Sequence, residues 1–535
     1  MLLRVRQRAA EGKPRASWRW TIGTAYPVVD LFAGPGGLGE GFASLKRLNG
    51  EARFKSFVSI ERDEYSHQTL LLRHFFHAFG PGEVPDDYYD FLARRLTLDE
   101  LFSRHPSEHQ FAQETALKIS LGRDSHNSVR SIIGDRLNGH DRWALVGGPP
   151  CQAYSLVGRS RMKGRADFEE DERHTLYLEY LRIVADHRPP VFVMENVKGL
   201  LSAKIDGKSV IHRIVKDLKQ PHSAIRSAPH ELTYNLYSLA HDEQAEGEVD
   251  PGMFLVRAEK FGIPQARHRM FIVGIRSDIR CRPGTLVPLN PPTVRQAIEA
   301  LPSIRSELSS AEDSVQSWVR ELRRLADVNV RKQLNGSAYS NAVIRDLSAS
   351  RLAALDSPSA TSSRRYPRRR PEHQILNGIY DSRLSTLTSH ESRSHMASDL
   401  RRYLFAAVFA SHAERSPALA DFPDELLPDH KNAKQGQQGK MFSDRFRVQL
   451  ADQVSTTITS HISKDGHYFI HYDPAQCRSL TVREAARLQT FPDNYFFCGP
   501  RTSQYHQVGN AVPPQLARQI AAVVAEVLDR VPSRR

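Results

Sequence analysis

The chain has 535 residues, which is too long for one ordinary hydrophobic core and predicts two or three domains. Hydrophobic residues make up 40% and charged residues 25%, as in soluble globular proteins, and the four cysteines form no C-x-x-C pair, which argues against a disulfide framework and a zinc site. Lys and Arg outnumber Asp and Glu by 74 to 61, and the net charge of +13 suits a polyanionic partner or, equally, a basic surface that serves solubility alone.

The N-terminal residues 1–23 are basic but lack the apolar core of a signal peptide. No apolar run approaches the length needed to span a bilayer. We therefore expect a cytoplasmic protein with no membrane partner.

From residue 24 onward, short apolar runs alternate with segments of helical periodicity. The runs expected to form buried strands are residues 26–32, 54–60, 143–148, 189–197 and 270–275. Residues 176–187 have the spacing of a helix between two of them. This alternation predicts an α/β fold with a mostly parallel sheet, helices on both faces and a ligand site at the carboxyl ends of the strands.

The periodicity changes after about residue 276. The following segment is rich in Ser, Arg and Pro and is too long to be one loop, whereas regular patterning returns toward the C-terminus and ends in a strong helical pattern. We therefore expect an N-terminal extension, a main domain, a smaller inserted domain and a C-terminal return to the main domain, at residues 1–23, 24–276, 277–470 and 471–535.

A glycine-rich turn follows the first expected strand. The strand ends at Phe32 and is followed, before a helix, by Gly34, Gly36, Gly37, Gly39 and Gly41. Glycines here let the backbone approach a ligand closely, and Glu61 after the second strand is suited to bind the two hydroxyls of a ribose. A nucleotide-like ligand fits this pair, but a tight turn with a chance acidic residue remains open, and dinucleotide-binding domains have a similar layout.

Cys151 stands in a context that the other cysteines lack. An apolar run ends at two glycines and two prolines, which stop regular structure, and the thiol follows at the edge where the ligand is expected. Nucleophilic catalysis needs a thiolate in a fixed position near positive charge or a helix N-terminus. We interpret Cys151 as a nucleophile, and Cys281, Cys477 and Cys498 as small buried hydrophobic residues.

Three further side chains are expected at the same edge of the sheet. Glu195 follows four apolar residues, so partial burial raises the pKa of its carboxyl; a helix cap is the alternative interpretation. Arg267 and Arg269 lie at alternate positions before a buried strand, with Gln265 on the same side. The two arginines are better explained as partners of a buried anion or a polarised carbonyl than as part of a solvent-exposed face of the strand.

Six segments carry a family resemblance when they are taken together and in order. They are DLFAGPGG at 30–37, GGPPCQAYS at 147–155, MENV at 194–197, QARHR at 265–269, LTVREAARLQTFPD at 480–493 and QVGNAVPP at 507–514. In this order they resemble the motif set of the C5-cytosine-specific DNA methyltransferases. The resemblance runs from about residue 24 to 525, apart from the variable inserted segment.

The resemblance implies S-adenosylmethionine as the cofactor and a Rossmann-like methyltransferase sheet. Phe32, Gly34 and Gly36 match the positions around its methionine and sugar, and Glu61 matches the residue that binds the ribose hydroxyls. The other matching cofactor positions are Asp135, near the adenine, Leu176, Asn510 and Val512. Arg62 stands where the family often has an aromatic residue, so we expect the adenine to be covered differently.

The resemblance also implies the chemistry. The Cys151 thiolate adds to C6 of cytosine, Glu195 donates a hydrogen bond or proton at N3, and Arg267 and Arg269 hold the O2 side and the nearby backbone. A base inside a duplex cannot present C6 to a thiol, so double-stranded DNA as substrate implies base flipping.

Two segments are expected to serve the DNA. Residues 155–173 are charged and contain glycine, and we favour a lid over the flipped base rather than an ordinary surface loop. Residues 277–470 match the variable target-recognition domain, whose arginines are expected to track phosphates. The Arg-rich stretch 362–373 fits either phosphate binding or a disordered basic tether.

Two other functions stay open at this point. Relatives with the same motifs methylate cytosine in tRNA, although their recognition segment is small, and a catalytically silent DNA-binding protein could keep the fold. We further expect a monomer, with a cognate restriction endonuclease or a defence system as a possible companion.

Overall fold

The computed structural model describes residues 25–122, 124–150, 172–205, 207–225, 232–242, 244, 250–309, 313–330, 334, 338–428, 444–464 and 466–532. Cys151 and residues 155–171 of the expected lid lie outside these ranges.

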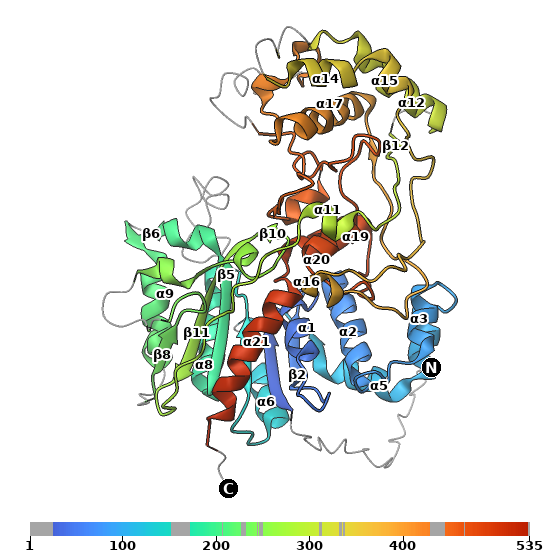
Figure 1. Cartoon of the computed structure of the whole chain (residues 1–535). Helices are drawn as coiled ribbons and strands as arrows, with labels where there is room; N and C mark the ends of the chain where they lie inside the picture. The colour runs from blue at the N-terminus through green and yellow to red at the C-terminus, as the bar shows by residue number, and fades with distance from the viewer. Residues whose placement is uncertain are drawn as a thin grey trace, which may run out of the picture.

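An eight-stranded sheet forms the centre of the main body (Figure 1). Its strands are β1 (Tyr26–Leu31), β2 (Phe54–Glu61), β3 (Ala116–Lys118), β4 (Ala144–Gly147), β5 (Val191–Val197), β8 (Tyr234–Tyr237), β9 (Leu255–Arg257) and β11 (His268–Arg276). The order is β3-β2-β1-β4-β5-β11-β8, with β9 paired to β11 outside this path. The strands from β3 to β5 are parallel and β11 is antiparallel to β5. β2 and β4 lie on opposite sides of β1, so the strand order reverses at β1. Open α/β sheets bind ligands at the carboxyl ends of the strands at such a point.

Side chains of the strands alternate between two hydrophobic layers. In β1, Val29 and Leu31 pack with helices α6 (His126–Leu137), α8 (Glu172–His187) and α9 (Val210–Lys219), whereas Val28 packs on the opposite face. Helices α1 (Gly37–Ser44) and α21 (Pro514–Asp529) cover that second face (Figure 1). The predicted α/β fold with helices on both faces is confirmed.

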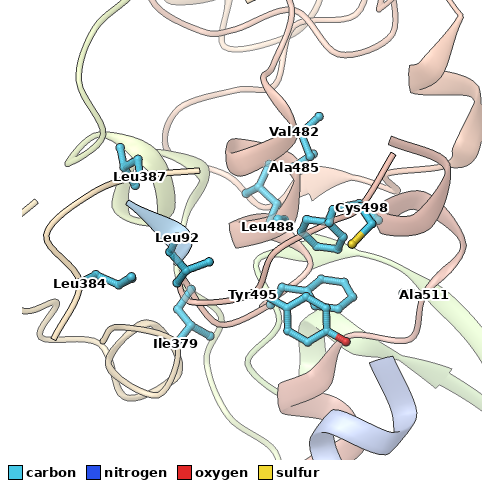
Figure 2. Close-up of a cluster of buried hydrophobic side chains, with 14 of the residues drawn as sticks. Leu92, Ile379, Leu384, Leu387, Val482, Ala485, Leu488, Tyr495, Cys498 and Ala511 are labelled. Carbon is cyan, nitrogen blue, oxygen red and sulfur yellow. The ribbon is translucent and has the colours of Figure 1, made fainter. Parts of the chain in front are cut away.

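A third hydrophobic cluster lies beside the sheet and joins distant parts of the chain. It combines α2 (Glu64–Ala78), α3 (Asp86–Leu92), α4 (Leu98–Arg104) and α5 (Pro106–Thr115) with α11 (Val294–Ile298), α19 (Val482–Leu488) and α20 (Arg501–Asn510). Figure 2 shows side chains of this one cluster from three regions of the chain, including Leu92, Leu384 and Leu488. Segments within the inserted region therefore also pack against the main body.

The remaining helices form a separate lobe above the sheet (Figure 1). Helices α12 (Val315–Arg323), α14 (Ser340–Asp346), α15 (Ala349–Ala353) and α17 (Ala397–Ala413) surround a core that contains Trp318 and Tyr403, both fully buried. We call this unit the helical lobe. The expected domain boundaries at residues 277 and 470 stay a prediction.

The other short elements are α10 (Pro221–Ala224), α16 (Gln374–Asn377), β6 (Lys204–Ile205), β7 (Lys208–Ser209), β10 (Gln265–Ala266), β12 (Glu307–Leu308), β13 (Ser394–His395) and β14 (Ser455–Thr456). Among the described helices, none combines the length and the apolar character that crossing a membrane requires.

Buried histidines lie where the helical lobe joins the main body. His390 donates from Nε2 to the Pro302 carbonyl at 2.9 Å, and its Nδ1 accepts from the Thr481 hydroxyl at 3.1 Å, so the ring is held in its neutral form. Burial lowers the pKa of His390 to about 4, and burial together with Arg478 lowers the pKa of His471 to about 4.

These histidines predict that the fold loses stability in mild acid. A histidine whose pKa is lowered by folding contributes its full stability above its unfolded pKa of about 6.5 and loses it as the pH falls toward 4. Once the pH is below that range, each histidine has lowered the free energy of unfolding by up to about 3 kcal/mol. Urea unfolding between pH 7.5 and 5 should show a free energy that falls with pH, and His390→Gln should reduce that slope, while His212→Gln at an exposed position should leave it unchanged. An equal slope in the His390 variant would contradict this assignment.

Candidate active site

A cavity of about 610 Å³ opens at the carboxyl ends of β1, β2, β4 and β5. It is within the usual range for a small-molecule site. The residues expected at the site that line it are Phe32, Gly34, Glu61, Leu176, Glu195, Asn510 and Val512.

The turn between β1 and α1 forms one wall of the cavity. Phe32 has a φ of 58°, which is unusual for a bulky residue and marks a constrained turn, and Gly34 follows with a φ of 58°. A Cβ on Gly34 would meet no atom within 4 Å, so it would project into open space, whereas a Cβ on Gly37 would lie 2.4 Å from the Val512 carbonyl oxygen. Gly34 therefore leaves space in the cavity, and Gly37 leaves space for the backbone of Val512. Gly36, with a φ of 98°, precedes α1 but does not line this cavity.

Glu61 ties the end of β2 to the glycine turn. Its Oε2 accepts from the Gly34 amide at 2.8 Å, and its Oε1 accepts from the amides of Arg62 and Asp63 at 2.9 and 2.7 Å. Charge-assisted bonds of this kind fix both the carboxylate and the turn. The carboxylate is therefore held in place at the cavity wall, with hydrogen-bonding capacity left for a ligand.

The ends of β4 and β5 lie directly against each other at the next wall. The Glu195 Oε2 would lie 2.8 Å from a Cβ on Gly148, so the carboxylate sits where any other side chain would stand. Asn196 donates from Nδ2 to the Pro149 carbonyl at 3.2 Å. These contacts fix the backbone up to Pro150, the last described residue before Cys151.

Glu195 carries a shifted pKa. Burial raises the pKa of its carboxyl, and the positive charges of Arg269 and Arg267 offset only part of this effect. Arg269 lies one strand away on the same face, with its Nε 3.1 Å from the Glu195 Oε1, and both side chains are 14% exposed. One carboxyl oxygen of Glu195 thus contacts Arg269, and the other lies against Gly148.

The two expected arginines have different partners. Arg267 is buried and donates from Nη1 to the Ile458 carbonyl at 2.7 Å and from Nη2 to the Gly509 carbonyl at 3.0 Å. Burial lowers the pKa of Arg267, and the nearby Arg269 adds to this shift. Gln265 is buried beside it and accepts from the Ile458 amide at 2.7 Å. Arg267 thus joins three segments of the chain, while Arg269 contacts the carboxylate of Glu195.

One expected site residue lies elsewhere. Asp135 is on the exposed face of α6, accepts a 3.3 Å hydrogen bond from the Ser131 hydroxyl and does not line the cavity. The resemblance implied Asp135 near the adenine, but residues 126–137 form a helix, and the strand that ends at this edge of the sheet is β3, which ends at Lys118.

The cavity contains residues that the sequence analysis did not single out. Ile119 and Leu121 follow β3, and Ser503 and His506 come from α20. The signal for the first two was available, because β3 is a short apolar run that ends at the same edge of the sheet. Arg62 also lines the cavity, where the family often has an aromatic residue.

Comparisons with known proteins agree with this geometry. The family model described as C-5 cytosine-specific DNA methylase matches residues 109–526. The chain is 31% identical over 530 residues to the Type II methyltransferase M.Bpa9945I of Bacillus paralicheniformis, covering 94% of this chain and 99% of that protein. It is 24% identical to the DNA (cytosine-5-)-methyltransferase M.ApeKI of Aeropyrum pernix, covering 95% and 99%.

A solved structure shares the fold. It is a prophage-encoded protein of E. coli described as a DNA modification methyltransferase, with a TM-score of 0.51, 17% identity and coverage of 94% of this chain and 100% of that chain. The family match identifies the activity and the cofactor to which the ordered motifs and the cavity correspond. The chain therefore belongs to the C-5 cytosine-specific DNA methylase family and is a DNA cytosine-5 methyltransferase that uses S-adenosylmethionine.

Proposed function

We propose that the 610 Å³ cavity holds S-adenosylmethionine and that Cys151, Glu195 and Arg269 act on a cytosine flipped out of duplex DNA toward it. The observation that carries the proposal is the position of Glu195. Its carboxyl lies over Gly148, three residues before Cys151, at the wall of a cavity that the glycine turn also lines.

The residues of the cavity fit this cofactor. Gly34 leaves space where a side chain would stand, and amides at the start of α1 suit a carboxylate group. The fixed Glu61 carboxylate suits a pair of ribose hydroxyls, and Leu121 and Leu176 offer an apolar surface to an adenine. When bound, S-adenosylmethionine supplies the electrophilic methyl group.

The chain's own residues activate the base. The Cys151 thiolate forms a bond to C6, and the electron pair of the C5–C6 double bond shifts through the ring toward N3. Burial raises the pKa of Glu195, which suits its carboxyl to deliver a proton to N3, so that no net charge builds up on the ring. Arg269 orients Glu195 and stabilises the carboxylate that remains. After methylation at C5, the C5 proton leaves to solvent, Cys151 is expelled as a thiolate, and N3 returns its proton to the Glu195 carboxylate, which restores the aromatic ring and both side chains.

Glu61 predicts a defect confined to the cofactor. Glu61→Ala removes the hydrogen bond from the Gly34 amide, the two from the amides of Arg62 and Asp63, and the expected contact to the ribose, so the Kd for S-adenosylmethionine should rise by about 10- to 100-fold. Calorimetric titration measures this. Glu64→Ala, at the exposed start of α2, is the matched control. Equal affinity in both variants would count against Glu61 as a cofactor residue, and weaker DNA binding would show damage beyond it.

We further propose that the helical lobe reads the target sequence. Its connections reach the edge of the cavity, since Arg501 at the start of α20 donates to the Ser392 carbonyl at 2.6 Å, and Ser463 lies 2.7 Å from the His506 ring. A duplex between the lobe and the sheet would thus meet both recognition and catalysis (Figure 1). Segment 277–470 as the target-recognition domain, and residues 155–173 as a lid, remain part of this proposal.

The substrate is tested by comparing duplex DNA with tRNA. Purified protein with labelled S-adenosylmethionine should modify only duplex DNA, and bisulfite sequencing of a host genome that expresses it should map one sequence context. Activity confined to tRNA would overturn the substrate proposal.

We infer the biological setting from the relative in Bacillus paralicheniformis, which is named a Type II methyltransferase. The chain then acts in the cytoplasm as a monomer, as the modification partner of a cognate restriction endonuclease. The test is whether bisulfite-mapped sites are protected from a nuclease encoded beside the gene.

A further inference from the structure

The Arg-rich stretch 362–373 has a fixed place on the main body. Tyr366 in its middle is 5% exposed, and its hydroxyl donates to the Asp493 Oδ2 at 2.9 Å. Arg487 in α19 holds the same carboxylate through two hydrogen bonds of 2.9 and 2.8 Å. A buried tyrosine on a paired carboxylate is a strong anchor, so this stretch is not a loose tether.

Contacts on both sides of Tyr366 fix the backbone of the stretch. The Leu387 amide donates to the Arg364 carbonyl at 2.8 Å, and the Tyr380 hydroxyl donates to the Arg368 carbonyl at 3.0 Å. The rings of Tyr366 and Tyr380 are stacked at 5.4 Å. These contacts fix the backbone of the stretch, which is the rigid support from which its arginine side chains extend.

A groove of about 1420 Å³ runs along this support, and we call it the arginine groove. The arginines that line it are Arg365, Arg368, Arg369, Arg370, Arg383 and Arg487. Arg365 and Arg368 are exposed and have no carboxylate partner among the residues that the structure describes. Arg369 pairs with Glu372, but both side chains are 86% exposed, so the pair contributes little.

The charge of this region is balanced only in part, because Arg383 pairs with Asp86 at 2.7 Å and Arg487 with Asp493 at 2.8 Å. Arg370 donates to the neutral amide oxygen of Asn377, and the carboxylates that line the groove are Glu299 and Glu372. Arg94 lies close enough to Arg364 to add to the lowering of its pKa by burial. Cations held together on a rigid support repel one another unless a polyanion neutralises them, which is the electrostatic signature of a phosphate-binding surface.

The arginine groove lies beside the active site but is not part of it. Arg487 of α19 lines the groove, and α19 packs against α20, which supplies Ser503 and His506 to the cavity. The groove therefore lies outside the cavity, on a helix that packs against one of the cavity's own helices, and a duplex that runs on from the cavity would meet it with base pairs outside the target sequence.

We propose that the arginine groove binds the phosphate backbone of duplex DNA that flanks the target site, roughly one helical turn from the flipped cytosine. It rests on the proposed placement of the duplex across the active-site cavity. The contact carries no sequence information and lengthens the footprint of the enzyme on DNA.

The test compares duplexes of about 16 and about 40 base pairs, both centred on the target sequence from the bisulfite map. The short duplex extends about 27 Å to each side, at 3.4 Å per base pair, and stops before the groove. Wild-type protein should bind the long duplex more tightly. The Arg365→Gln/Arg368→Gln variant should lose that advantage, and its slope of log affinity against log salt on the long duplex should fall by about 2.

The matched control removes two charges elsewhere. Arg213→Gln/Lys216→Gln changes the exposed face of α9 on the other side of the sheet, and it should behave like wild type on both duplexes (Figure 1). Methylation of the short duplex at saturating DNA should be the same in all three proteins, because both variants leave the cavity intact.

Each alternative result has a separate meaning. Equal loss on both duplexes, no loss on either, or a loss seen only with RNA would overturn the arginine groove as a flanking-DNA site. Failure of wild-type protein to methylate the short duplex while it methylates the long one at saturation would overturn the proposal that the cavity and the helical lobe suffice for recognition. The groove and the proposed function therefore fail by distinguishable outcomes.

Discussion

Replacing Glu195 with glutamine should lower kcat by about 10²- to 10⁴-fold, the range for loss of a general acid. The amide can still donate a hydrogen bond at N3 but cannot deliver a proton, so negative charge builds up on the ring after Cys151 adds. The isosteric side chain keeps the geometry at Gly148 and can still accept a hydrogen bond from Arg269, although the ion pair is lost. Single-turnover methylation measures the chemical step directly.

The pH profile separates this role from a structural one. Because burial raises the pKa of Glu195, the active protonated form is lost as the pH rises through that value, and wild-type activity should fall on this alkaline limb. Glu195→Gln should lose the limb. Glu259→Gln is the matched control: it removes a carboxylate that lies 2.8 Å from His268, and it should keep both kcat and the pH profile. An unchanged alkaline limb in Glu195→Gln would contradict the acid role.

Replacing Cys151 with serine should abolish methylation, by more than about 10⁴-fold, as expected when a covalent nucleophile is lost. A serine hydroxyl is far less acidic than a thiol, so almost no anion is available to add to C6. Duplex DNA containing 5-fluorocytosine provides the measurement, because fluorine at C5 cannot leave as a proton does and the covalent adduct persists. Wild-type protein with cofactor should form a denaturant-resistant adduct, and Cys151→Ser should form none.

The same experiment decides between an enzyme and a silent DNA-binding protein. Cys281→Ser makes the identical change at a partly exposed cysteine far from the cavity and should form the adduct as wild type does. An adduct in Cys151→Ser would assign the nucleophile elsewhere. Absence of the adduct in wild-type protein would support the silent interpretation for this chain.

Local patterns in the sequence were sufficient for the sheet and for part of the cavity. Buried strands appear as continuous apolar runs, and a turn that needs a φ of 98° at Gly36 appears as glycine. Glu61 and Glu195 follow such runs directly, so their place at the carboxyl edge of the sheet follows from strand geometry alone. Only the strand that precedes each residue was needed to predict its position.

The position of Asp135 was inferred from the resemblance and not from a local pattern. In the structure its segment forms α6, which packs against β2 and α8 and leaves Asp135 on the exposed face. Ile119 and Leu121 occupy the cavity instead, because β3 is the strand that pairs with the end of β2.

The amino-acid sequence by itself determined the fold class, the glycine turn and the acid at the strand edge, because each depends on neighbours along the chain. Only the tertiary structure decided that Arg269 contacts Glu195 while Arg267 binds the carbonyls of Ile458 and Gly509. It also decided that Tyr366 anchors the Arg-rich stretch on Asp493. Such pairings join residues more than seventy positions apart, so they depend on where separate segments meet in the folded core, which no local periodicity encodes.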